Sequence, residues 1–131
     1  MSKFSKRILS SSKHCRNSLV VGGGFGWLEE LINHCNTVFI IDSPDKNIKG
    51  RTIVHREDFR DIQVLSDIDF IFIDSCHFSN LNKLKPVWTK CRPVIFLEGA
   101  DLFGKENYKY LRSENYSLVE IFKNMQKWVP Q

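Results

Sequence analysis

The chain has 131 residues, of which 42% are hydrophobic and 26% are charged, and its formal net charge is +4. This length and composition predict one globular domain with a core of its own. They exclude a membrane-spanning protein, because no apolar run approaches the roughly 20 residues that a transmembrane helix needs. We expect a cytoplasmic location, since no apolar stretch of a secretory signal follows the N-terminus and the four cysteines form no C-x-x-C pair.

The positive charge is concentrated at the start of the chain. Residues 1–17 contain five basic residues and no acidic residue, whereas residues 18–131 contain 14 basic and 15 acidic residues. We therefore predict a solvated basic tail over residues 1–16 and a single domain over residues 17–131. Only this tail has the charge that contact with nucleic acid would need.

The first predicted elements surround a glycine cluster. A strand is predicted at residues 18–22, where an apolar run ends at Gly22. An amphipathic stretch at residues 27–35 has helical spacing, and a second predicted strand at residues 37–42 ends at Asp42. Glycine lets a ligand approach the backbone, and the helix that follows presents free N–H groups. Asp42 stands about 20 residues after the first glycine, a spacing at which a carboxylate can bind ribose hydroxyls. This β-α-β unit predicts a nucleotide-type binding turn.

The rest of the chain continues the alternation of strands and helices. Apolar runs predict strands at residues 52–55, 69–74 and 93–98, helices are expected at 79–90 and 103–113, and a β-rich pair at 116–122 and 128–129 follows, with a turn at 123–127 between them. The pattern predicts an α/β fold: a three-layer, doubly wound, mostly parallel sheet of Rossmann-like type, with an antiparallel C-terminal edge. Residues 43–51 are few for a crossover with a helix, so we expect a reduced form of this fold.

The glycine turn and the order of the elements resemble the class I S-adenosylmethionine-dependent methyltransferases, of which the chain would be a compact or degenerate member. Those enzymes place G-x-G-x-G after their first strand, which Gly22, Gly24 and Gly26 match. They also place an acidic residue at the end of the second strand, which Asp42 matches. The resemblance implies that the glycine turn would hold the methionine part of the cofactor and Asp42 its ribose.

Two further segments resemble this family. Asp58 and Phe59 occupy the place of an acidic and an apolar residue beside the adenine, and the stretch that ends in Asp74 and continues to His77 resembles a strand-4 end found in some small-molecule methyltransferases. The resemblance implies a methyltransferase that binds S-adenosylmethionine and acts on a small molecule or a macromolecule. Asp74 and His77 would then face the acceptor, with His77 as a general base.

The same turn allows other interpretations. Many family members have an acidic residue two positions before the first glycine, where this chain has Val20. This departure favours the alternative of a non-catalytic Rossmann-like interaction or structural module without a cofactor. A dinucleotide-binding turn would need glycine in place of Trp27, and the turn of aminopropyltransferases such as spermidine synthase would need aspartate in place of Phe25.

The polar candidates also have simpler structural interpretations. Asp42 and Asp74 can each cap the turn that follows a strand, Asp58 can pair with a neighbouring arginine, and a loop histidine such as His77 is often merely solvated. We predict no metal site, although three adjacent pairs, His14–Cys15, His34–Cys35 and Cys76–His77, contain zinc-type ligands. With so little chain to cover the ligand edge, we expect at least a dimer.

Overall fold

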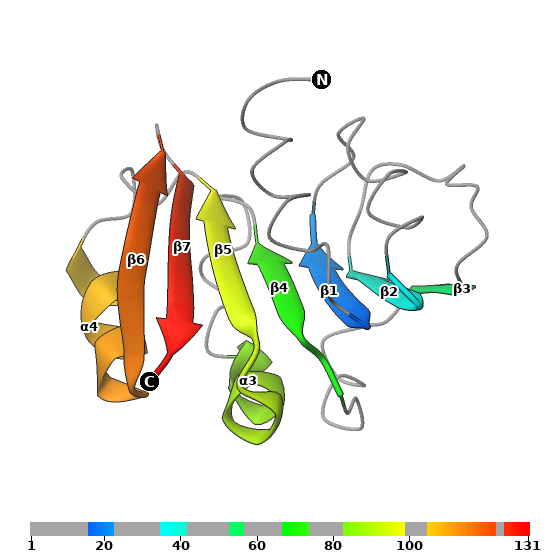
Figure 1. Cartoon of the computed structure of the whole chain (residues 1–131), viewed down its shortest axis with the longest axis horizontal. Helices are drawn as coiled ribbons and strands as arrows, with labels where there is room; N and C mark the ends of the chain where they lie inside the picture. Colours follow the sequence, from blue (N-terminus) through cyan, green and yellow to red (C-terminus); the bar gives the residue numbers. More distant parts are fainter. Residues whose placement is uncertain are drawn as a thin grey trace.

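The computed structural model describes seven stretches of the chain, which are residues 16–22, 35–41, 53–56, 67–73, 83–98, 105–122 and 125–131. They form the elements β1 (Asn17–Val21), β2 (Thr37–Ile41), β3 (Ile53–Arg56), β4 (Phe70–Ile73), α3 (Lys85–Cys91), β5 (Val94–Glu98), α4 (Lys105–Ser113), β6 (Tyr116–Phe122) and β7 (Met125–Pro130). The strands make one seven-stranded sheet in the order β3-β2-β1-β4-β5-β7-β6 (Figure 1).

The pairing of the strands confirms the predicted fold class. The strands from β3 to β5 in this order are parallel, and β7 runs antiparallel to both of its neighbours, β5 and β6. The result is a reduced Rossmann-like α/β fold with an antiparallel C-terminal edge. The predicted strands agree with the observed ones to within one residue at each end for β1 to β6. The predicted helix at residues 27–35 lies outside the described residues, apart from Cys35, which belongs to a bend before β2.

The central strands carry continuous apolar runs because both faces of the sheet are buried there. In β1, Leu19 and Val21 point to one face and Val20 to the other, and all three are fully buried. In β4, Phe70 and Phe72 alternate in the same way with Ile71 and Ile73. Residues of such strands read as continuous hydrophobic runs, which is why the sequence located them well.

Both α3 and α4 pack on the face of the sheet that carries Leu19 and Val21. The ring of Trp88 in α3 lies 5.4 Å from that of Tyr110 in α4, measured between centroids, and joins the two helices. Pro86 is accommodated in the first turn of α3, where its missing N–H is not needed. The helix ends at Arg92, which is left-handed (φ 53°) and donates its backbone N–H to the Trp88 carbonyl at 2.9 Å.

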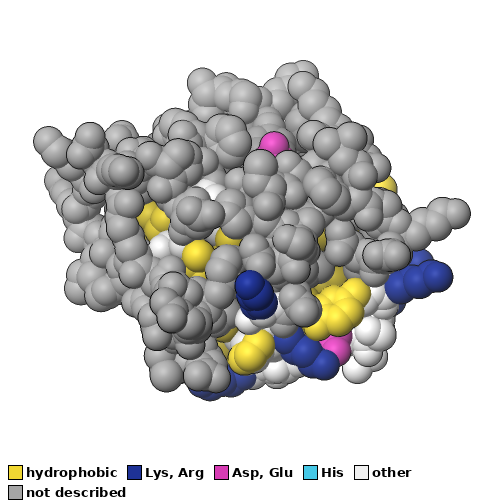
Figure 2. Space-filling view, turned by 180° about the vertical axis from the view of Figure 1, so that it is seen from behind, with side chains coloured by type: hydrophobic (Ala, Val, Ile, Leu, Met, Phe, Trp, Pro, Cys, Tyr) yellow, Lys and Arg dark blue, Asp and Glu magenta, His cyan; other side chains and the backbone are white. Residues whose placement is uncertain are grey.

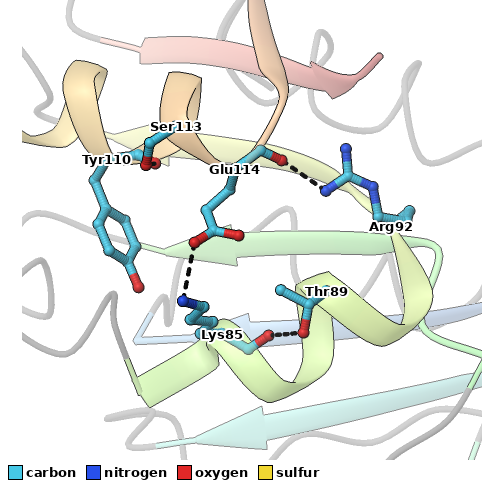
Figure 3. Close-up of polar contacts among 6 residues, drawn as sticks. All are labelled: Lys85, Thr89, Arg92, Tyr110, Ser113 and Glu114. Carbon is cyan, nitrogen blue, oxygen red and sulfur yellow. Dashed lines mark hydrogen bonds and ion pairs between the residues drawn. The ribbon is translucent and has the colours of Figure 1, made fainter.

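A cluster around Arg92 joins α3 to the turn after α4. The guanidinium of Arg92 donates to the carbonyls of Glu114 (2.8 Å) and Asn115 (2.9 Å) and lies 4.6 Å from the centre of the Tyr116 ring. Lys85 pairs with the Glu114 carboxylate at 3.0 Å (Figure 3). The Tyr116 hydroxyl donates to the Pro93 carbonyl at 2.8 Å. These contacts tie the starts of β5 and β6 together at the amino edge of the sheet.

This cluster makes the stability of the fold sensitive to alkaline pH. Burial raises the pKa of the Tyr116 hydroxyl well above its ordinary value of about 10, and the nearby Arg92 charge offsets only part of this effect. Below pH 10 the tyrosine is neutral in both the folded and the unfolded chain. Above pH 10 the unfolded chain ionises first, so the stability that this group contributes is lost as the pH rises.

We expect Tyr116→Phe to cost about 1–2 kcal/mol at neutral pH, because the Pro93 carbonyl loses its buried partner. The variant should then lose stability less steeply than the wild type above pH 10, by up to about 1.4 kcal/mol for each pH unit. Urea unfolding at several pH values measures both effects. The hydrogen bond to Glu114 also raises the pKa of Lys85, but that pair is present in both proteins. Equal slopes would contradict the prediction.

The C-terminal hairpin differs from the prediction in one respect. Residues 123–127 were expected to form a turn, whereas β7 already begins at Met125. Met125, Gln126 and Lys127 pair with β5 on one side and with β6 on the other. The prediction of a turn was wrong because pairing with strands on both sides holds these residues extended, and their local sequence does not reveal that pairing. Among the residues that the structure describes, neither helix is long and apolar enough to cross a membrane.

Candidate functional site

The order of the strands reverses at the centre of the sheet, between β1 and β4. From β1 the chain builds outward through β2 and β3, and it then returns to place β4 and β5 on the other side of β1 (Figure 1). In open sheets of this kind, ligands bind outside the carboxyl ends of the strands at the point of reversal. Register places Ile41, Val21, Ile73 and Leu97 in one row across the sheet. The ends of four strands are therefore level at this edge.

Gly22 forms the bend at the carboxyl end of β1. Its φ is 82°, in the left-handed region that favours glycine, and its N–H donates to the carbonyl of Ile41 at 2.8 Å. The residue is buried. A side chain here would meet both backbone strain and crowding, so the requirement for glycine that the sequence suggested has a geometric cause. The hydrogen bond also holds the end of β1 beside the end of β2, whose next residue in the chain is Asp42.

The described part of the chain includes only one of the predicted site residues, Gly22. The other predicted residues lie outside it, and these are Gly24, Gly26, Asp42, Asp58, Phe59, Asp74 and His77. Asp42 and Asp74 are each the next residue in the chain after a described strand, β2 and β4 respectively. These two strands flank β1 on its two sides.

Val20 and Glu98 decide which polar groups the described strands present near the carboxyl edge of the sheet. Val20, which stands where many methyltransferases have an acidic residue, is fully buried in register with Ile40 and Phe72. It contributes no polar group to a ligand. Glu98 ends β5 at the carboxyl edge and is half-buried. The sequence analysis predicted that this strand ends in an acidic residue but assigned Glu98 no role. Its position beside the end of β4 follows from the order of the strands, which the sequence does not give.

At the amino edge of the sheet, the carboxylate of Asp69 has a structural role. Asp69 Oδ2 accepts hydrogen bonds from the backbone N–H of Arg16 (2.6 Å) and of Asn17 (3.4 Å). The side-chain amide of Asn17 donates to the Asp67 carbonyl at 2.9 Å. These bonds satisfy donors at the start of β1 and connect it to the segment before β4. The amino edge is thus closed by the protein's own polar groups.

No group of three or more metal-type ligands occurs within the described ranges. Cys35, from one of the histidine–cysteine pairs, is buried, and Cys91 is half-buried. The residues of the other two pairs lie outside these ranges.

The comparison with solved structures identifies the fold. A methyltransferase from Geobacter sulfurreducens is similar over 100% of this chain and 80% of its own, with a TM-score of 0.69 and 16% identity. The N-methyltransferase NodS from Bradyrhizobium japonicum WM9 is similar over 98% of this chain and 93% of its own, with a TM-score of 0.62 and 14% identity. The chain has a class I methyltransferase-like fold. TrmK from M. capricolum has the same fold, with a TM-score of 0.60 and 11% identity over 98% of this chain and 67% of its own.

The similarity is confined to structure. Comparison of the sequence itself finds no matching family model and no matching curated protein. The methyltransferase-like fold is therefore established by geometry, as the glycine turn and the order of elements had predicted.

Proposed function

We propose that this chain binds S-adenosylmethionine at the carboxyl edge of its sheet and transfers the methyl group to a small molecule or a macromolecule. The observation that supports this proposal most is the left-handed bend at Gly22, which lies beside the reversal of strand order and is bonded to the end of β2. A bend of this kind leaves the backbone without a side chain where ligands bind in such folds. The TrmK structure of the same fold contains S-adenosylhomocysteine.

The roles of the other residues follow from the resemblance to class I enzymes. Gly24 and Gly26 would continue the cradle for the methionine part, Asp42 would bind the ribose hydroxyls, and Asp58 with Phe59 would lie beside the adenine. A carboxylate suits the ribose because it accepts two hydrogen bonds from adjacent hydroxyls. Each of these roles is a prediction that substitution can test.

The chemistry that the cofactor supplies is a methyl group on a positively charged sulfur. An oxygen or nitrogen of the acceptor would form the new bond to the methyl carbon as the bond from carbon to sulfur breaks, leaving a neutral thioether. The acceptor's proton needs a base, and the imidazole of His77 can accept it near neutral pH. Asp74 would orient the acceptor. Holding the two reactants in line is the main contribution of such a protein.

The second candidate function is a module of this fold that does not catalyse methyl transfer. The buried Val20 favours it, because the acidic residue that many family members use at this position is absent. This module would need no cofactor, so the absence of S-adenosylmethionine binding would support it. Failure to bind the cofactor at all would exclude the first candidate.

Titration calorimetry with S-adenosylmethionine and S-adenosylhomocysteine tests the proposal. We expect Asp42→Ala to weaken binding by roughly 10- to 100-fold, the equivalent of about 1.5–3 kcal/mol for hydrogen bonds to a charged group. Asp45→Ala is the matched control, since it removes the same carboxylate three residues further along the chain. No heat with the wild type would contradict cofactor binding. Equal affinity in both variants would remove Asp42 from the site but leave binding intact.

A further inference from the structure

The outer surface of α3 and α4 concentrates positive charge. The segments 83–92 and 109–115 contain six basic residues and one acidic residue, Glu114, whereas the rest of the chain from residue 18 onward has eight basic and 14 acidic residues. We call these six residues the basic helix face, and they are Lys83, Lys85, Lys90, Arg92, Lys109 and Arg112. Figure 2 shows dark-blue side chains across the lower half of the view and at its right margin, with yellow side chains and a magenta one between them.

Three of these six cations have no partner among the residues that the structure describes. Lys85 engages the Glu114 carboxylate, and Arg92 donates to the Glu114 carbonyl (Figure 3). Arg92 also donates to the Asn115 carbonyl and lies over the Tyr116 ring. Lys90, Lys109 and Arg112 are exposed, and among the described residues their side chains have no hydrogen-bond or ion-pair partner. The Glu114 carboxylate is thus already engaged, and no described residue pairs with the other three cations.

The two helices hold the backbone positions of these cations in a fixed arrangement. Trp88 is fully buried beneath α3 and contacts Tyr110 of α4, and the ion pair between Lys85 and Glu114 bridges the same two segments. Side chains on rigid, connected helices lose less freedom on binding than those of an unstructured segment. The basic helix face is therefore a preformed surface.

We propose that the basic helix face binds the sugar-phosphate backbone of a nucleic acid. Interfaces with nucleic acid are polar and strongly positive, whereas the centre of a protein–protein interface is apolar and poor in charge. The exposed large hydrophobic residues of the described chain are Val119 and Ile121, both on β6, and the basic helix face contains none. An acidic protein would meet no apolar centre here, but a phosphate backbone needs only cations and hydrogen-bond donors.

This surface is separate from the cofactor site. Arg92 leads directly into the start of β5, and the turn at Glu114 leads into the start of β6, so the face extends toward the amino edge of the sheet. S-adenosylmethionine would bind at the opposite, carboxyl edge. The inference therefore goes beyond the proposed function and stands whether or not the chain transfers methyl groups.

Fluorescence anisotropy with a labelled single-stranded RNA and a labelled duplex DNA tests the inference on the full chain. The variant Lys90→Gln, Lys109→Gln, Arg112→Gln removes the three available cations. Its matched control is Lys3→Gln, Lys6→Gln, Arg7→Gln, which removes two lysines and one arginine from the N-terminal tail and leaves the same net charge. Both variants should keep the thermal stability of the wild type, since the three residues on the helix face are exposed.

We expect the wild type to bind, with an affinity that falls as salt rises between about 50 and 200 mM. In the helix-face variant, the slope of log affinity against log salt for RNA should fall by about 2, and affinity near 0.1 M salt should fall at least about tenfold. The tail variant should bind almost as the wild type does. Tighter binding of RNA or of DNA identifies which polymer the face meets, and either result supports the inference.

Three results would overturn it. The first is that the wild type binds neither polymer at low salt. The second is that the two variants lose affinity equally, which would mean that only net charge matters. The third is that polyglutamate competes as well as nucleic acid does, with the same dependence on Lys90, Lys109 and Arg112, because the face would then be a site for acidic protein.

Discussion

Replacing Trp88 with alanine should lower the free energy of unfolding by about 3–5 kcal/mol. The side chain is fully buried in α3, where it packs on the sheet and against Tyr110. Alanine would leave a cavity beneath a helix of only seven residues and would remove the ring that joins α3 to α4. The free energy of unfolding of a domain is about 5–15 kcal/mol, so this substitution would remove a large part of the stability. Urea unfolding followed by circular dichroism measures it.

Replacing each buried tryptophan with phenylalanine separates the effect of lost side-chain volume from the effect of a lost hydrogen bond. Trp88 and Trp128 are both fully buried, but they differ at the indole nitrogen. Trp128 Nε1 donates to Gln126 Oε1 at 3.0 Å, whereas Trp88 Nε1 is among the described buried polar atoms that have no partner. Trp128→Phe should therefore cost about 1 kcal/mol more than Trp88→Phe, because it removes a buried hydrogen bond that Trp88 does not make. Equal costs would show that the two nitrogens are equivalent.

The second large effect is expected at Gly22. Gly22→Ala should destabilise the fold by about 1–2 kcal/mol, because alanine pays for the left-handed conformation that glycine adopts freely. If the proposed function is correct, the same variant should also weaken binding of S-adenosylmethionine by at least about tenfold, since the added methyl group and any shift of the turn narrow the cradle. Thermal unfolding and calorimetry measure the two effects separately.

Tyr116→Phe is the control for this experiment. It is expected to lose a similar amount of stability, but it alters the amino edge of the sheet and not the carboxyl edge. Its affinity for the cofactor should match the wild type. A folded Gly22→Ala protein that binds the cofactor with unchanged affinity would contradict the proposed position of the cofactor. Unchanged stability of this variant would contradict the expected cost of placing alanine in the left-handed conformation.

The strands could be predicted well where burial on both faces makes them continuously apolar. Residues 70–73 and 94–97 read as unbroken hydrophobic runs, and they are the core of β4 and β5. The prediction failed at residues 125–127, where Gln126 and Lys127 look like a turn but belong to β7. Their extended conformation depends on hydrogen bonds to β5, which is distant in the sequence, and to the antiparallel strand β6. No local sequence pattern indicates these pairings.

The basic helix face shows how composition can hide a surface. Residues 18–131 are almost neutral in total, which suggested that only the N-terminal tail could meet a polyanion. The fold instead gathers basic residues of α3 and α4, which are separated by β5 in the chain, and leaves most acidic residues in other segments. A sum of charges has no spatial information, whereas contact between Trp88 and Tyr110 brings the two segments together.

The local sequence by itself determined the alternation of strands and helices, the glycine bend after β1 and hence the fold class, because hydrophobic period and backbone freedom act over a few residues. Only the tertiary structure decided the order of the strands, the insertion of β7 between β5 and β6, and the alignment of four strand ends beside Gly22. These features arise from contacts between distant segments, and their energy is gained only when the whole sheet assembles.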